Sequence, residues 1–246
     1  MSLDSGRTVR ELAIEIPNAT RTFEKLGIDY CCGGSKSLHD ACVQAQIPVE
    51  HVLDELERAG SFTPTAETTG QDFANGTLSW LVERIIAKHH GYVKQEIPRL
   101  QQLLNKVVAV HGTIRPELGQ IRKLFQEMAA ELTSHMMKEE RILFPFIVEL
   151  EEAVSNGRAK PRPAFGTVKN PIHMMSLEHD SAGAAIKEIS ALSSNYEPPK
   201  GACFSYKTLF AALKEFETDL HQHVHLENNF LFPRAIAMEN NAESGE

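Results

Sequence analysis

The sequence predicts an all-α protein in which a small helical domain precedes an up-down-up-down four-helix bundle. Four long stretches of helical periodicity are separated by proline-containing loops. Strand-type alternation and hairpin dipeptides are scarce. One motif, His-x-x-x-Glu-x-x-x-Leu-Phe-Pro, occurs twice, at residues 135–145 and 223–233. The two copies would lie in the second and the fourth of these long helices, so the motif connects the predicted fold with a candidate site.

The composition excludes several classes of partner. Of 246 residues, 42% are hydrophobic and 24% are charged, which is ordinary for a soluble globular protein. The formal charge is −8 and there is no run of lysine or arginine, which argues against nucleic acid or a membrane surface as partner. No secretory segment or membrane span is evident, and four cysteines do not make a disulfide framework. We therefore expect a cytoplasmic protein.

Residues 1–60 read as a small domain of short helices. A first helix over Thr8–Ile16 should stop at Pro17, and a second, capped by Asn18, should end at Gly27. Ser37 should cap a third helix, and Pro48 should open a fourth that ends at Gly60. The short apolar stripes would make only a marginal core.

A linker and the bundle follow. Residues 61–72 are rich in threonine, glycine and proline and are typical of a linker. Residues 73–240 carry the four long helical patterns, at about 73–110 with a bend at Pro98, 116–155, 171–193 and 203–238.

The bundle reads as two similar helical hairpins. Within each copy of the motif the histidine and the glutamate are four residues apart, so a helix presents them on one face. A lone histidine precedes each copy at a matched distance: His90 is 45 residues before His135, and His179 is 44 residues before His223. If the hairpins converge, they supply four imidazoles and two carboxylates, namely His90, His135, Glu139, His179, His223 and Glu227.

This donor set predicts two metal ions. Six ligands are too many for one tetrahedral zinc, whereas two first-row ions could share them with the glutamates as bridges. Iron is the best match, although manganese and zinc fit the same donors. Open positions would remain for water, dioxygen or nitric oxide. The bland alternative, that such a pair is a solvated ion pair, holds for most single occurrences but not for a repeated one.

Several neighbouring histidines compete for these roles. The spacing favours His90 over His89 only weakly. The alignment of the two copies selects His223 over His221 and His225, whose meaning stays open. Glu178 is expected to support a ligand or to be solvated. The remaining histidines are expected at the surface: His39, His51, His111 and His173.

Cys31 and Cys32 form a separate candidate site. Adjacent cysteines do not readily form a disulfide with each other, and Gly33-Gly34 after them makes a flexible turn where a thiolate could be exposed. We take both as candidate catalytic residues in thiol redox chemistry or in passing iron or electrons. A buried turn of small residues is an equal alternative. Cys42 and Cys203 are expected in the core.

The residues resemble a known family. Asp29-Tyr-Cys-Cys-Gly-Gly34, followed by a bundle with His135-x-x-x-Glu139 and His223-x-x-x-Glu227-Asn-Asn, is similar to the repair-of-iron-centres family of bacterial di-iron proteins with a hemerythrin-like domain. The resemblance covers nearly the whole chain. It implies that the six residues above are iron ligands, with Glu139 and Glu227 bridging two non-haem irons. It also implies that Cys31 and Cys32 belong to a domain needed for full function.

The same resemblance implies a function. It is the repair of iron–sulfur clusters damaged by nitrosative or oxidative stress, by iron donation, by nitric oxide reduction, or by both. The expected partners are damaged iron–sulfur proteins and nitric oxide or dioxygen, with a homodimer left open. The alternatives are a hemerythrin-like sensor or binder of these gases without turnover, and a purely structural bundle.

Overall fold

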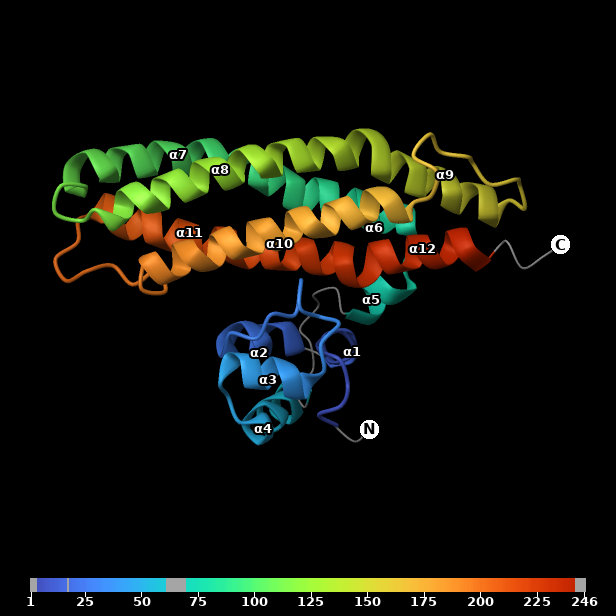
Figure 1. The fold of residues 1–246 in the computed structure, drawn as a ribbon, viewed down its shortest axis with the longest axis horizontal. Coiled ribbons are helices and arrows are strands. Elements are labelled where there is room, and N and C mark those ends of the chain that lie inside the picture. Colours follow the sequence, from blue (N-terminus) through green and yellow to red (C-terminus); the bar gives the residue numbers. More distant parts are fainter. Residues whose placement is uncertain (1–3, 17, 61–69, 242–246) are drawn as a thin grey trace. The chain divides into compact units, whose positions relative to one another are not determined.

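The computed structural model describes residues 4–16, 18–60 and 70–241 (Figure 1). These residues form helices, with one isolated antiparallel bridge between Thr8 and Ser37, so the predicted all-α class is confirmed. They divide into two compact units: Met1–Leu81 with Val224–Arg234, and Val82–His223 with Ala235–Glu246. In the part of the chain that the structure describes, no helix is both long and apolar enough to cross a membrane.

The first unit contains short helices around a small apolar core. Thr8 caps the first helix in a reciprocal capping box with Glu11, and Ser37 accepts a hydrogen bond from the backbone N–H of Asp40 at the start of the third. The core includes the fully buried Leu12, Phe23 and Leu56. The helices are α1 (Val9–Glu15), α2 (Ala19–Leu26), α3 (Leu38–Ala45), α4 (Val49–Gly60), α5 (Gly70–Asn75) and the start of α6 (Leu78–Arg84).

One capping expectation needs a correction. Asn18 does precede α2, but its backbone is left-handed (φ 62°) and its side chain makes no capping hydrogen bond. Asparagine tolerates this conformation better than most residues, so it serves the chain reversal before the helix rather than the helix N–H groups. Gly27 ends α2 at φ 66°, as expected. Pro17 and residues 61–69 of the expected linker lie outside the described residues.

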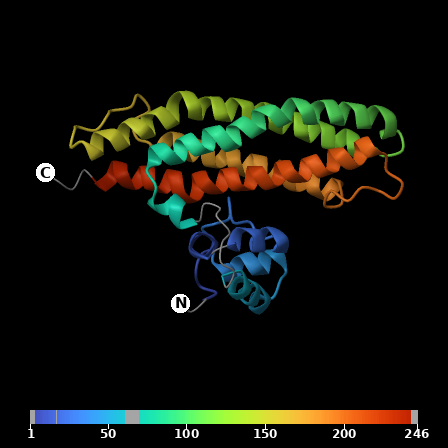
Figure 2. The same ribbon diagram turned by 180° about the vertical axis from the view of Figure 1, so that it is seen from behind.

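The second unit is built from long helices that run side by side, as Figure 1 and the reverse view in Figure 2 both show for α7, α8, α10 and α11. Phe216 of α11 packs edge-on against Phe125 of α8, with ring centroids 5.5 Å apart. The helix α7 continues through Pro98. The helices of this unit are α7 (Gly91–His111), α8 (Glu117–Lys138), α9 (Phe144–Ser155), α10 (Lys169–Leu192), α11 (Phe204–Leu226) as far as His223, and α12 (Phe232–Asn241) from Ala235.

Three π-helical segments interrupt the long helices, at Ile85–His90, Glu139–Leu143 and Glu227–Leu231. The last two begin at the glutamates of the repeated motif. Each ends where a phenylalanine N–H reaches the carbonyl of that glutamate, five residues earlier. Proline follows immediately, and it has no N–H to donate. Leu-Phe-Pro therefore marks a change of helical geometry within a continuing helix, of the kind often found at functional sites.

The remaining cysteines were expected in the core and the remaining histidines at the surface, and the structure agrees only in part. Cys42 is buried, but Cys203 is exposed, because it lies in the loop just before α11 and not on its inner face. The expectation of a core Cys203 is therefore wrong. His39, His51 and His173 are exposed, as expected. His111 is partly buried and packs against Tyr206, with ring centroids 5.5 Å apart.

Candidate metal centre

The six side chains that the repeat singles out come together in the structure. All six are buried, with at most 1% of each residue exposed. Their donor atoms form two groups, each within 4.8 Å of one another: His90, Glu139, His223 and Glu227, and His135, Glu139, His179 and Glu227. The two glutamates belong to both groups. Each group takes one histidine from each hairpin, an assignment that the sequence repeat does not specify.

The helices bring these donors together at close range. The Nε2 atoms of His90 and His223 are 3.1 Å apart, and those of His135 and His179 are 3.0 Å apart. Glu139 lies between the groups: its Oε2 is 3.4 Å from His90 Nε2 and its Oε1 is 3.2 Å from His135 Nε2. Glu227 follows His223 by one turn of the same continuous helix. The arrangement is that of two adjacent positions with carboxylates able to bridge them.

Two further carboxylates orient the histidines. Nδ1 of His90 is 2.7 Å from Oε1 of Glu140, and Nδ1 of His135 is 2.8 Å from Oε2 of Glu178. When Nδ1 carries the proton and donates it to a carboxylate, Nε2 keeps its lone pair and points it inward, as a metal ligand requires. Glu178 thus has the supporting role that was one of its two expected roles. Glu140 was missed.

Lysines keep these outer carboxylates charged. Lys94 donates to both oxygens of Glu140, at 2.6 and 2.8 Å, and Lys138 donates to Glu178. Partial burial alone would raise the pKa of Glu140, but the hydrogen bonds from Lys94 and His90 lower it below its usual value. The pKa of Glu178 is lowered against burial in the same way, by Lys138 and His135. Both histidines therefore face a carboxylate that stays ionised.

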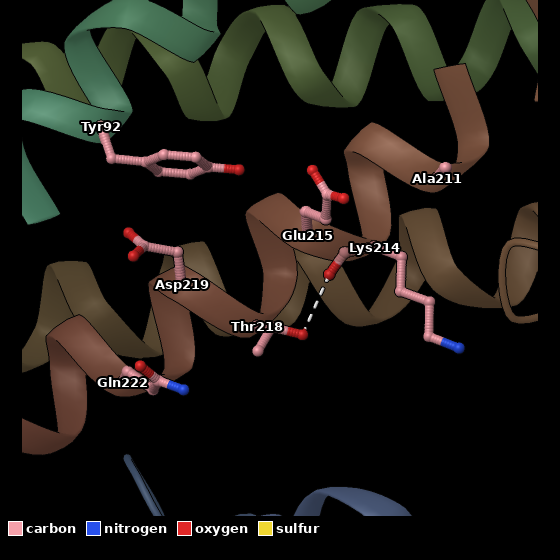
Figure 3. A pocket seen from close by; sticks show the side chains of 7 residues that line it. All are labelled: Tyr92, Ala211, Lys214, Glu215, Thr218, Asp219 and Gln222. Atoms are coloured by element: carbon pink, nitrogen blue, oxygen red, sulfur yellow. Dashed lines mark hydrogen bonds between the residues drawn. The ribbon is translucent and has the colours of Figure 1, made fainter. Parts of the chain in front are cut away.

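His89 is next to the centre without belonging to either donor group. Its ring stacks on that of His223, with centroids 5.7 Å apart and planes at 9°, and its Nδ1 is 2.9 Å from Oδ1 of Asp219. Burial lowers the pKa of His89, although Asp219 opposes this. Asp219 also lines a pocket between α7 and α11 (Figure 3), whose other lining residues are Tyr92, Ala211, Lys214, Glu215, Thr218 and Gln222. The structure thus places His90, and not His89, among the grouped donors.

His225, which the alignment of the motif left without a role, packs within the first unit against Tyr30 and Asn229. It is buried, which lowers its pKa to about 3, and its Nδ1 accepts a hydrogen bond of 2.7 Å from Asn229. Its ring meets that of Tyr30 edge-on at 5.1 Å. His221 is only partly buried. The two extra histidines therefore differ in kind.

The same segment holds the cysteine turn. Asn229 donates a hydrogen bond of 2.9 Å to the carbonyl of Tyr30 and accepts one of 2.7 Å from the side chain of Arg10. Asn228 donates a hydrogen bond of 3.3 Å to the carbonyl of Cys31. Cys31 is buried and Cys32 is partly exposed; both are thiols. The sequence left open a buried turn or an exposed thiol. The structure combines the two, since Cys31 Sγ is packed inside the unit and Cys32 is partly accessible to solvent.

The donor set fits a metal centre. Four imidazoles with inward nitrogens and two shared carboxylates would be a costly cluster to bury if they served only packing. Imidazole and carboxylate donors suit borderline first-row ions.

Comparison with known proteins agrees with this geometry. Residues 81–235 match the hemerythrin HHE cation binding domain, and residues 5–60 match a domain of unknown function, DUF542. The chain is 36% identical over 231 residues to a protein of Haemophilus influenzae named "Probable iron-sulfur cluster repair protein", covering 92% of this chain and 95% of the relative. It is also 36% identical over 234 residues to "Iron-sulfur cluster repair protein YtfE" of Yersinia pseudotuberculosis, covering 94% and 97%. The chain therefore belongs to the family of iron–sulfur cluster repair proteins that join a DUF542 domain to a hemerythrin HHE cation binding domain.

Proposed function

We propose that this protein is a di-iron protein that takes part in repairing iron–sulfur clusters damaged by nitrosative or oxidative stress. The observation that carries the proposal is the pair of buried donor groups that share Glu139 and Glu227. The names of relatives that align over more than nine-tenths of the chain supply the substrate class. Damaged iron–sulfur proteins are the proposed partners, and the cytoplasm is the proposed compartment.

The proposed ligands divide the work between them. His90 and His223 would hold one iron, His135 and His179 the other, and Glu139 and Glu227 would bridge the two. Bound iron would supply redox chemistry and open positions for nitric oxide or dioxygen. Glu140 and Glu178 keep the rings of His90 and His135 oriented, and the surrounding helices exclude bulk water from all six donors.

The test is recovery of a damaged cluster. A [4Fe–4S] hydratase is inactivated with nitric oxide and then incubated with the reduced, iron-loaded protein, and its activity is measured over time. We expect recovery with the full chain and none with a Glu139→Ala/Glu227→Ala double variant. Equal recovery with both proteins would refute the proposal.

Two routes to repair are distinguished in the same experiment. If the protein donates iron, ⁵⁷Fe loaded into it should appear in the repaired cluster. If it removes nitric oxide by reduction, nitrous oxide should form over several turnovers while the label stays in the protein. A stable nitrosyl with neither product would instead favour a non-catalytic sensor.

A further inference from the structure

The turn Asp29–Gly34 gathers three metal-type donors that the histidine–glutamate centre does not use. The carboxylate of Asp29 and the thiols of Cys31 and Cys32 have ligand atoms within 4.8 Å of one another. Cys31 Sγ is 3.9 Å from Cys32 Sγ and 3.3 Å from Asp29 Oδ1. Ideal tetrahedral bonds to zinc would place two sulfurs roughly 3.8 Å apart, and a sulfur and an oxygen roughly 3.6 Å apart. The turn is thus close to chelating geometry.

The turn is held in this shape from within. Asp29 Oδ1 accepts hydrogen bonds from the backbone N–H groups of Cys31 at 3.1 Å and Cys32 at 2.9 Å, which fixes the carboxylate against both cysteines. A Cβ on Gly33 would lie 2.8 Å from the carbonyl oxygen of Asp29. Only glycine lets the chain close this tightly around the three donors.

It is also held from outside. Asn228 and Asn229 bond the carbonyls of Cys31 and Tyr30, and a Cβ on Gly34 would lie 2.9 Å from the side-chain oxygen of Asn229. These contacts fasten the backbone on both sides of Cys31. Donors that are ordered before binding lose less conformational entropy when a metal arrives.

The surroundings are wrong for a reactive thiolate. Nucleophilic cysteines lie beside cations or helix N-termini. Here the hydrogen bond with Cys32, burial and the Asp29 carboxylate all raise the pKa of Cys31. Two sulfurs with an adjacent carboxylate instead make an electron-rich group that suits a soft or borderline cation, which would displace the thiol protons itself.

We propose that Asp29, Cys31 and Cys32 form a second metal site, for one thiophilic divalent ion. Binding forms two sulfur–metal bonds, breaks two S–H bonds and releases two protons to solvent. Three protein ligands leave the fourth position of a tetrahedral ion to water or to an incoming ligand. Because Asp29 is exposed and Cys32 is partly exposed, the ion can exchange with a donor or acceptor outside the protein. None of the three residues is a proposed ligand of the di-iron centre.

The experiment is a Co²⁺ titration of the reduced, metal-free full chain. Cobalt bound to thiolate gives an intense near-ultraviolet charge-transfer absorption, which cobalt bound to imidazole and carboxylate lacks. We expect this absorption to saturate with one thiolate-bound cobalt per chain, in addition to the cobalt that the histidine–glutamate centre takes up, and to fall when Zn²⁺ displaces the cobalt. It should be lost in Cys32→Ser, whose side chain is partly exposed and tolerates the change, and weakened in Asp29→Asn, which keeps an oxygen to accept the two backbone hydrogen bonds.

Cys203→Ser is the matched control. Cys203 is exposed and its Sγ lies 3.3 Å from His111 Nε2, whereas Cys42 is buried, so Cys203 is the accessible competing thiol in the described residues. The Cys203→Ser variant should show the same absorption as the unmodified chain. No sulfur-to-cobalt absorption in the unmodified chain, or an absorption that survives Cys32→Ser and disappears in Cys203→Ser, overturns the proposal. Neither result bears on the proposed histidine–glutamate centre, because the iron content of the protein tests that centre separately.

Discussion

At the scale of single residues, the carboxylates behind the histidines matter as much as the histidines. Glu178 of α10 contacts both His135 and Lys138 of α8, so it orients one ring while its own charge is neutralised. Such supporting carboxylates fix the tautomer of a ligating histidine and increase its basicity. Removing the charge should therefore weaken the metal centre without removing a ligand.

We predict that Glu178→Gln lowers metal affinity about 10- to 100-fold. Competition with a chelator of known affinity measures the change. Glu188→Gln is the control, since Glu188 is exposed on the same helix, and it should leave the affinity unchanged. An unchanged affinity in Glu178→Gln would mean that His135 needs no partner at Nδ1.

At the scale of elements, the π-helical segments and the cysteine turn are the local departures that carry function. The segment Glu139–Leu143 starts at a shared glutamate, and Glu227–Leu231 repeats the arrangement in the other hairpin. In the cysteine turn, Gly33 fits against the Asp29 carbonyl with no room for a side chain. These shapes depend on proline and glycine at fixed positions and not on helix propensity.

Two glycine substitutions should have opposite effects. Gly33→Ala places a Cβ 2.8 Å from a backbone oxygen, so we predict that it lowers the free energy of unfolding by about 1–3 kcal/mol. Gly119→Ala in α8 meets nothing within 4 Å and adds helix propensity, so it should stabilise by up to about 1 kcal/mol. Urea unfolding followed by circular dichroism compares the two. A Gly33→Ala chain as stable as the original would show that the turn can open without cost.

At the scale of the whole molecule, much of the fold follows from the helical periodicity of apolar residues and from the residues that begin and end helices. The last three long helices were expected within a few residues of where they lie, and so were the helices that begin after Thr8, Ser37 and Pro48. The first was expected from about residue 73, but it begins at Leu78, after the separate short helix α5 (Gly70–Asn75). Recurrence made the site visible, because a His–Glu pair that appears twice at matched offsets demands a common explanation. The structure brings the six predicted residues together; their role as ligands stays a prediction.

The missed features depend on contacts between distant segments. Glu140 directly follows Glu139, and neighbours on an α-helix point about 100° apart, so spacing provides no reason to place both near one centre. Its partner His90 comes from a helix 50 residues earlier. Cys203 looked like a core residue by type, but its place at a loop end exposes it. Side-chain partners across helices cannot be read from local pattern alone.

The most direct test of the account is the iron content of the freshly purified protein, with Mössbauer spectroscopy to report how the ions are coupled. We predict two irons per chain with the spectrum of a bridged pair, and at most one iron per chain in His135→Ala and in Glu139→Ala. Two irons retained by both variants would contradict the claim that these side chains hold a shared metal pair.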